Sequence, residues 1–325
     1  MIKDQQSSKM NPSLSNNPDI KQSKLTQKKP SEGLALLMGK KPTAVEKQLG
    51  KPDRIDQTGY GYVWYIYNQD YSRYLQVGVE NNHVVTIYAV GDNLDVAPFE
   101  IGQPVEEIYN TQYIDANIDI KLKGNTYRFE LNDTDLNIRP IVHLGNLYVQ
   151  LYIDKFTGNL SSIRFLDANT LIKLRPYELT YSGHLEEPPP LSLDMLKSIE
   201  DDTAKEVFDI TNVLRLRNNV KPLIWDDGTA MVAYNHSKDM AENNDFSHTS
   251  KKYGTLSERL QDAEISYKSS GENIAANYSD APAVVEGWLN SSGHRDAILN
   301  RSFSYLGVGV YQKYYTQDFI EKPEQ

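Results

Sequence analysis

The chain has 325 residues, a formal net charge of -10 and a pI near 5.2, and it contains no cysteine. This length exceeds one ordinary hydrophobic core, so two or three domains are expected. The acidic charge argues against nucleic-acid binding, because such domains are usually basic. The lack of cysteine excludes disulfides, thiolate zinc sites and cysteine nucleophiles, and no apolar run is long enough to span a bilayer.

The first 30 residues carry six lysines against Asp4 and Asp19 and have almost no hydrophobic periodicity. A segment of this composition buries too little apolar surface to offset its ordering entropy, so we expect a disordered basic tail over residues 1–30. It lacks the apolar middle region of a signal peptide. Two interpretations stay open: a flexible tail, or a stalk that tethers the protein to a membrane through an anchor missing from this sequence.

Residues 31–175 contain a weak internal repeat. The segment 38–46 resembles the segment 101–108, and in each copy Gly and Pro precede a short predicted helix. Alternating runs typical of strands follow each helix, with Asn81-Asn82 as a hairpin turn in the first copy. Two helix-plus-meander units predict an α+β domain with one shared sheet.

Three successive prolines at 188–190 predict a semi-rigid linker over residues 176–200. From residue 201 to 325 the pattern becomes helical and then strand-like. Thr203 opens a capping-box pattern that predicts a helix start, and further helix starts are predicted near Asp227, Thr255 and Asp280. Two strands are predicted over 305–313 and 314–320, with glycines in the first where another element must approach closely.

Short polar motifs separate these C-terminal elements. A chain of this kind can bring residues from separate loops together on a packed scaffold. The motifs are 246–248 (Phe-Ser-His), 271–275 (Gly-Glu-Asn-Ile-Ala), 288–295 (Trp-Leu-Asn-Ser-Ser-Gly-His-Arg), 307–309 (Gly-Val-Gly) and 315–319 (Tyr-Thr-Gln-Asp-Phe).

Together and in this order, the motifs resemble the bacterial branch of the CAP superfamily (cysteine-rich secretory, antigen 5, pathogenesis-related), also called SCP-like domains. The resemblance covers about residues 203–320. The unit before it is similar to the CAP-associated N-terminal domain that precedes such modules in Gram-positive bacteria. The resemblance implies a C-terminal α-β-α sandwich with an open cleft, within an α+β protein that is extracellular or anchored at the cell surface.

In the eukaryotic pattern, two histidines and two glutamates line the cleft. By motif, the resemblance implies that His248, His294 and Glu272 are three of these residues. The second glutamate falls near Ser291, so this sequence departs from the pattern there. Ser291 itself is an expected cleft residue, and Asn273, which follows Glu272 directly, completes the set.

Two imidazoles and a carboxylate are a plausible ligand set for a divalent cation such as zinc, with an open position for water. His248, His294 and Glu272 are therefore the candidate metal ligands, and Glu272 is the candidate catalytic base. The structural alternative is that Glu272 and Asn273 hydrogen-bond loop amides and that His294 caps a helix. His236 is expected to be a half-buried structural histidine, and Arg295 to pair with an acid or a carbonyl.

We expect a binding module rather than an enzyme, whose cleft engages a small lipid-like, glycan or peptide ligand, with or without a divalent cation. One alternative is a metal-dependent hydrolase that acts on peptides or cell-wall material. The other is a structural envelope protein whose sheets bind partners. No nucleic-acid partner is expected.

Overall fold

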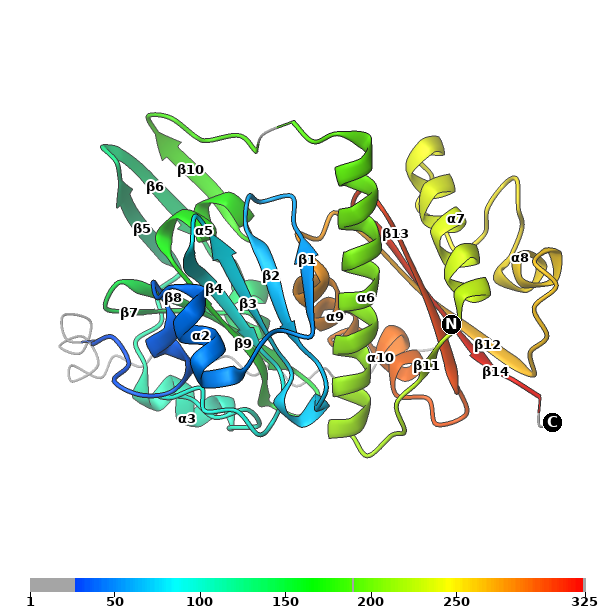
Figure 1. Cartoon of the computed structure of the whole chain (residues 1–325), viewed down its shortest axis with the longest axis horizontal. Coiled ribbons are helices and arrows are strands. Elements are labelled where there is room, and N and C mark those ends of the chain that lie inside the picture. Colours follow the sequence, from blue (N-terminus) through cyan, green and yellow to red (C-terminus); the bar gives the residue numbers. More distant parts are fainter. Residues whose placement is uncertain (1–26, 189, 324–325) are drawn as a thin grey trace, which may run out of the picture.

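The computed structural model describes residues 27–188 and 190–323, so most of the predicted tail lies outside the described residues. Within these ranges, no helix combines the length and the apolar character that a membrane crossing requires. The chain forms two α+β units that pack side by side (Figure 1).

The N-terminal unit consists of short helices and ten strands. Its helical elements are η1 (Leu34–Leu37), α2 (Pro42–Leu49), η2 (Tyr71–Arg73), α3 (Val105–Thr111), α4 (Asp133–Ile138) and α5 (Ala168–Leu174). Its strands are β1 (Arg54–Gln57), β2 (Val63–Tyr67), β3 (Leu75–Glu80), β4 (His83–Ala89), β5 (Asn117–Leu122), β6 (Asn125–Glu130), β7 (Ile141–Leu144), β8 (Leu147–Asp154), β9 (Asn159–Leu166) and β10 (Glu178–Ser182).

The predicted repeat is visible in a seven-stranded antiparallel sheet of order β1-β2-β3-β4-β9-β8-β7. Strands β1 to β4 come from the first copy and β7 to β9 from the second, and the copies meet where β4 pairs with β9. The β3–β4 hairpin turns at Asn81 and Asn82, whose φ angles of 48° and 63° suit this tight turn. The shared sheet predicted from the sequence is therefore present.

Strands β5 and β6 of the second copy do not join this sheet. They form a separate three-stranded sheet of order β10-β6-β5. Strand β10 lies in the segment predicted as linker, so the linker prediction is wrong at its start. The side chains of β10 show little alternation between buried and exposed positions, so its sequence pattern alone does not indicate a strand. It is a strand because it pairs with β6.

The C-terminal unit begins with a long helix and ends with a hairpin. Its elements are α6 (Leu193–Arg217), β11 (Ile224–Trp225), α7 (Asp227–Asn243), α8 (Leu256–Asp262), β12 (Ser269–Ala276), α9 (Ala281–Leu289), α10 (Ser292–Ile298), β13 (Tyr305–Tyr311) and β14 (Tyr314–Glu321).

Helix α6 starts about ten residues before the predicted position. Ser192 is its N-cap and accepts a hydrogen bond from the Met195 amide, whereas the capping pattern at Thr203 lies inside the helix. The predicted starts of α8 at Thr255, with a complete capping box, and of α9 at Asp280 are confirmed. A cap pattern inside a helix is indistinguishable from one at its start until the preceding turns are seen.

The C-terminal sheet, of order β11-β13-β14-β12, lies between α7 on one face and α6, α9 and α10 on the other (Figure 1). The predicted α-β-α sandwich is therefore present. Gly307 and Gly309 let α7 approach β13: a Cβ on Gly309 would lie 1.9 Å from the Tyr234 backbone nitrogen. This contact explains the glycines predicted to permit close approach.

The two units share one hydrophobic core. Trp64 and Tyr88 of the seven-stranded sheet belong to the same buried cluster as Val207 of α6 and Trp288 of α9. A buried ion pair crosses the interface, with Arg164 Nη1 2.6 Å from Asp280 Oδ2. Apolar contact on this scale makes the units one packed body rather than two domains on a flexible linker.

Candidate functional site

The candidate site is built around Glu272 on strand β12. The side chain of Glu272 is only 5% exposed, and on the neighbouring strand Asp318 of β14 lies directly opposite it. Asp318 is fully buried. The antiparallel register thus places two carboxyl groups side by side in the middle of strands β12 and β14.

His248 reaches Glu272 from the loop that follows α7. Its Nδ1 lies 2.8 Å from Glu272 Oε1, while the ring remains 57% exposed. An ionised carboxylate only accepts hydrogen bonds, so Nδ1 donates and Nε2 is directed away from this bond. The carboxylate therefore fixes the orientation of an open imidazole.

Arg259 of α8 holds the same carboxylate from the other side. Its guanidinium pairs with Glu272 Oε2, and both side chains are almost completely buried. The Arg259 Nη1 also donates to the carbonyl oxygens of His248 and Gly254, each at 3.0 Å. Arg259 therefore neutralises Glu272 and fixes the loop that carries His248.

His294 lies in the first turn of α10, close enough to His248 for their charges to interact. Asn273 is buried and donates from Nδ2 to the His294 carbonyl oxygen at 3.1 Å and to Gln317 Oε1 at 3.1 Å. Asn273 therefore positions α10 instead of facing an open cleft. Ser291 is the N-cap of α10 without a side-chain capping bond, and it is partly exposed.

Three residues of the cluster were not predicted as site residues: His236, Arg259 and Asp318. The half-burial predicted for His236 is wrong: it is 1% exposed, and its Nε2 lies 3.7 Å from Glu272 Oε2. Asp318 belongs to the quoted 315–319 motif, so strand pairing with 271–275 was a signal that pointed to it. No spacing in the sequence points to Arg259.

The pKa values of the two carboxyl groups in the cluster are shifted in opposite directions. Burial raises the pKa of Glu272, but the hydrogen bond from His248 and the charge of Arg259 outweigh it, so the pKa lies below the usual value. Burial and the neighbouring Glu272 charge raise the pKa of Asp318 well above its usual value. Of the two, Glu272 is therefore the carboxyl group that ionises at lower pH, and Asp318 keeps its proton to higher pH.

The pKa values of the three histidines are also shifted in different directions. The hydrogen bond with Glu272 raises the pKa of His248 above 6.5. Burial lowers the pKa of His236 and that of His294, and the charge of His248 lowers the latter further. His248 therefore keeps its proton to higher pH than His236 and His294 do.

Comparison with known proteins identifies the families that the two units of the chain match. Residues 208–320 match the cysteine-rich secretory protein (CAP) family, and residues 38–177 match the CAP-associated N-terminal family. The Bacillus subtilis protein YlbC, described as an uncharacterized membrane protein, is 50% identical over 293 residues, which are 90% of this chain and 85% of YlbC. This chain belongs to the CAP family.

Solved CAP structures agree over nearly the whole chain. An extracellular protein containing a SCP domain from Bacillus anthracis has a TM-score of 0.86 at 40% identity, covering 99% of this chain and all of that one. A cysteine-rich secretory protein from Staphylococcus aureus has a TM-score of 0.82 at 28% identity, covering 91% and 97% of the two chains. The predicted resemblance of both units is confirmed.

The predicted zinc site finds no support in the geometry of this CAP cluster. Among residues 27–188 and 190–323, no group of three or more His, Asp or Glu side chains is arranged to hold a metal ion. The physical reason lies in Glu272, whose two oxygens are already paired with His248 and Arg259. A cation would have to displace a buried guanidinium.

A serine nucleophile is also not placed for attack. In the part of the chain that the structure describes, no serine hydroxyl hydrogen-bonds to His248 or His294, although Ser247, Ser291 and Ser292 are neighbours in sequence. Arg295 pairs with Asp154 in the N-terminal domain and also donates to the Leu289 carbonyl oxygen, which confirms the prediction of an acidic or carbonyl partner. The chemistry that remains is that of an open imidazole with fixed orientation.

Proposed function

We propose that this CAP protein is a surface-associated binding module that holds a small ligand at His248 and His294. The observation that carries the proposal is the bond from His248 to the buried Glu272, because it orients an exposed imidazole without engaging its second nitrogen. A raised pKa makes this ring a frequent N–H donor near neutral pH. A donor of this kind suits carbonyl, carboxylate and hydroxyl oxygens of a glycan or a peptide.

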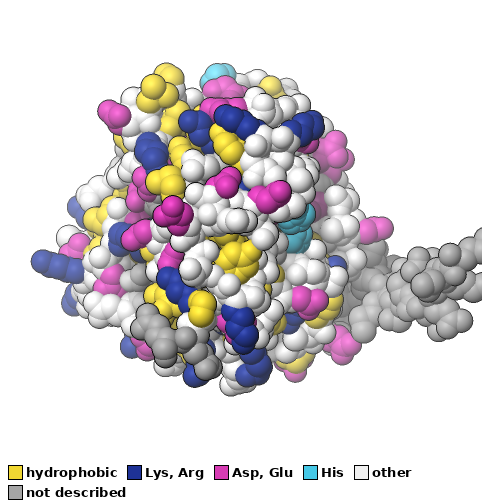
Figure 2. All heavy atoms as spheres, turned by 90° about the vertical axis from the view of Figure 1, so that its right-hand side faces the viewer, with side chains coloured by type: hydrophobic (Ala, Val, Ile, Leu, Met, Phe, Trp, Pro, Cys, Tyr) yellow, Lys and Arg dark blue, Asp and Glu magenta, His cyan; other side chains and the backbone are white. Residues whose placement is uncertain are grey.

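The surface around the site is consistent with a small polar ligand. Figure 2 shows acidic and basic side chains interspersed over this side of the molecule, with histidine side chains reaching the surface. The exposed apolar side chains of this region, such as Phe246 and Tyr253, lie in the loops beside His248. Aromatic rings next to a polar donor are typical of sites for glycans and peptides.

A hydrolase is the second candidate, and the cluster argues against it. A general base works best when its pKa is near the working pH, whereas the pKa of Glu272 is lowered and both its oxygens are paired. Displacing Arg259 would leave a buried cation without a partner. We therefore assign Glu272 the role of positioning His248.

The proposed location is the outside of the cell. The support comes from the relatives: the Bacillus anthracis structure is described as an extracellular protein, and YlbC as a membrane protein. Protease treatment of intact cells that express the protein tests this. Digestion of the protein without digestion of a cytoplasmic marker is expected, and full protection would contradict it.

The binding proposal is tested by calorimetry with a soluble disaccharide–peptide fragment of peptidoglycan, which carries a glycan and a peptide in one molecule. Saturable binding is expected for the wild type, with a loss of about tenfold or more in His248→Ala, which removes one charged hydrogen bond. His83→Ala is the matched control, because His83 is an exposed histidine in the N-terminal domain. Absence of binding, or equal binding by both variants, would overturn the proposal.

Two further arms separate the alternatives. The first uses mass spectrometry to follow the peptidoglycan fragment. If the wild type releases smaller products from it and Glu272→Gln does not, the protein is a hydrolase instead. Zinc titration at pH 7.5 addresses the metal: micromolar binding that is lost in both His248→Ala and His294→Ala would show that a cation takes part. Under the proposal, neither signal is seen.

A further inference from the structure

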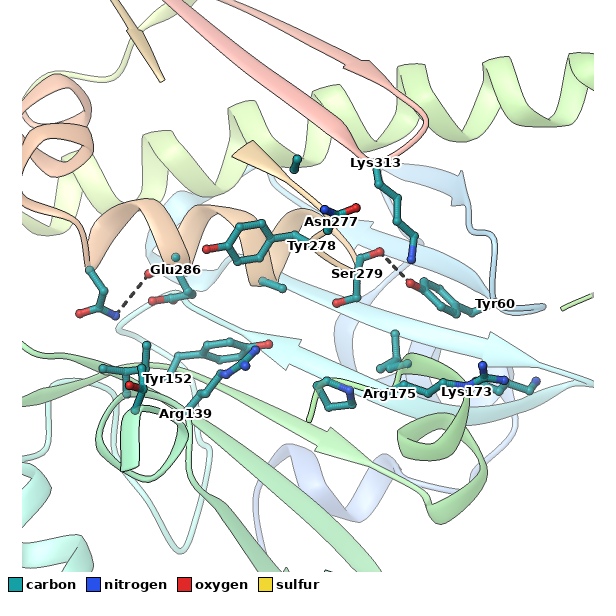
Figure 3. Close-up of a pocket in the computed structure, with 18 of the residues that line it drawn as sticks. Tyr60, Arg139, Tyr152, Lys173, Arg175, Asn277, Tyr278, Ser279, Glu286 and Lys313 are labelled. Carbon is teal, nitrogen blue, oxygen red and sulfur yellow. Dashed lines mark hydrogen bonds between the residues drawn. The ribbon is translucent and has the colours of Figure 1, made fainter. Parts of the chain in front are cut away.

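A cavity at the domain interface is lined by neither His248 nor His294. Its volume is about 710 Å³, and its wall is formed by β8, α4 and α5 of the N-terminal domain and by the β12–α9 connection of the CAP domain (Figure 3). Pockets of about 300–1,000 Å³ commonly hold small ligands. This cavity belongs to neither domain alone.

Cationic side chains enter the cavity from three separate segments. Arg139 follows α4, Lys173 and Arg175 end α5, and Lys313 lies in the β13–β14 turn. Figure 3 shows Lys313 extending from that turn toward Tyr60. Cations that converge from distant parts of the chain repel one another unless an anion lies between them.

These cations retain binding capacity. Lys313 makes no ion pair with any described residue. Arg139 uses Nε for Asp135 at 2.7 Å, which leaves its two terminal nitrogens. The Arg175 Nε is buried without a hydrogen-bond partner, and a buried unpaired donor costs free energy. Lys173 pairs with Glu80, so it contributes less.

The acidic side chains of the wall are Glu286 and Glu187. Glu286 is buried, and its Oε1 accepts hydrogen bonds from Ser161 at 3.1 Å, from Tyr88 at 3.3 Å and from Ser162, whereas its Oε2 is buried without a partner. Glu187 lies at the rim with its side chain 73% exposed and pairs with Arg175. Because Arg139, Lys173 and Arg175 each pair with an acid, Lys313 is the cation of the wall that has no acidic partner among the described residues.

The backbone at Arg175 adds an independent observation. This residue ends α5 with φ 47° and ψ 55°, the left-handed conformation that helix ends usually give to glycine or asparagine. A side chain in this conformation costs about 1 kcal/mol or more. A strained arginine with an unpaired, buried donor at a cavity wall points to a ligand that uses it.

The remaining wall carries groups that suit hydroxyls. Tyr278, Tyr60 and Tyr152 face the cavity, and Asn277 provides a carboxamide at its edge (Figure 3). Tyrosine rings and carboxamides commonly contact sugars and polyols, because they combine an apolar surface with hydrogen-bonding groups. A purely inorganic anion would use only the cations.

We propose that this interdomain cavity binds an anionic sugar or polyol, whose phosphate or carboxylate is held by Arg139, Arg175 and Lys313 while Tyr278 and Asn277 face its hydroxyls. The inference is independent of the proposed function, because none of these residues belongs to the His248 cluster. A ligand here contacts both domains, so its binding also stabilises their mutual arrangement.

The test is calorimetry on the full chain with three probes of similar size: a glycerol phosphate trimer, a glucuronate trimer and neutral maltotriose. Binding of at least one anionic probe is expected, weakened about tenfold in Lys313→Ala, as for the loss of one charged contact. Lys221→Ala is the matched control, because Lys221 is an exposed lysine outside the cavity. The two anionic arms decide between phosphate and carboxylate.

Arg175→Gly guards against a folding artefact. Glycine accepts the left-handed conformation without strain, so this variant is expected to keep or raise the unfolding temperature while losing affinity. His248→Ala is expected to bind as the wild type does, which separates this site from the proposed function. No binding of either anionic probe, equal binding by Lys313→Ala and Lys221→Ala, or equally strong binding of maltotriose would overturn the proposal.

Discussion

Glu272 and Asp318 lie directly opposite each other on strands β12 and β14, and their pKa values are shifted in opposite directions, that of Glu272 downward and that of Asp318 upward. Two adjacent buried carboxylates would repel each other strongly, so one of them retains its proton. Arg259 and His248 decide which one, because both contact Glu272. The cluster is therefore one negative charge held between a guanidinium and an imidazole, with a neutral acid behind it.

This division of charge predicts opposite effects of two isosteric substitutions. Glu272→Gln leaves Arg259 buried without its partner and should lower the free energy of unfolding by about 3 kcal/mol or more. Asp318→Asn replaces a neutral acid with a neutral amide and should change it much less. Urea unfolding at pH 7 measures both. An equally large loss in Asp318→Asn would mean that Asp318 carries a charge.

The histidines should titrate in a definite order. His248 is expected to titrate above 6.5, and His294 below it, in an NMR pH titration of the ring protons. Since the pKa of His248 is higher in the folded state than in the unfolded chain, its bond to Glu272 stabilises the fold below about pH 6.5. This contribution is lost as the pH rises through the folded-state pKa.

Glu272→Gln provides the control for that titration. Without the carboxylate, the pKa of His248 should fall toward or below its ordinary value, because the hydrogen bond with Glu272 is the largest cause of the rise. A His248 that titrates below His294 in the wild type would contradict the assignment.

The interface between the domains should itself depend on pH. Burial raises the pKa of Asp56 from 3.8 to about 6, although Arg54 pairs with it at 2.7 Å. Arg54 also pairs with Asp209 of α6 at 3.1 Å, so this network joins the two domains. Because the folded state binds the proton more tightly, stability should rise as the pH falls from about 6 toward 4.

Asp56→Asn should remove this dependence, since asparagine does not titrate. The difference in unfolding free energy between wild type and variant is expected to change with pH only in that window, by at most about 1.4 kcal/mol per pH unit. Urea titrations at half-unit steps from pH 4 to 7.5 measure it. A difference that stays constant over the whole range would show that Asp56 titrates normally.

The ion pair of Arg295 with Asp154 predicts a cost for separating the domains. The two Arg295 terminal nitrogens lie 3.0 and 2.9 Å from the Asp154 oxygens, and both side chains are largely buried. Arg295→Gln should destabilise the protein by about 3 kcal/mol, because Asp154 is left as an unpaired buried charge. It should also speed proteolysis within the segment 183–191.

The control is Arg301→Gln, which changes an exposed arginine of the same domain. Its stability should match the wild type within about 0.5 kcal/mol, as is usual for surface substitutions. The double variant with Asp154→Asn should recover part of the loss, since no unpaired charge remains. No recovery in that cycle would assign the loss to packing instead.

The sequence contained much of the fold because local chemistry specified it. The capping box at Thr255, the N-cap at Asp280 and the close-approach glycine Gly309 each predicted a feature that the structure has. Strand β10 was not predicted, because it is a strand only through its pairing with β6, about fifty residues away in the sequence. Local patterns do not encode such pairing.

The candidate site was likewise predicted only in part. His248, Glu272 and His294 stand in recognisable motifs, and the structure brings His248 to Glu272 and His294 near His248. Arg259 was missed because an arginine on a short amphipathic helix is ordinary until its burial is known. Yet Arg259 decides the chemistry, since it neutralises the carboxylate that a metal would need.

The shared core has a consequence for how the protein can be divided. A cut between residues 183 and 188 separates two sequences that each match a family, but it uncovers Trp64 and Tyr88 on one piece and Val207 on the other. Each fragment would present a broad apolar face and tend to aggregate. A CAP domain without an N-terminal domain must therefore carry polar residues on the face that α6 and α9 form here. The polarity of that face thus indicates whether a given CAP domain evolved together with an N-terminal domain of this kind.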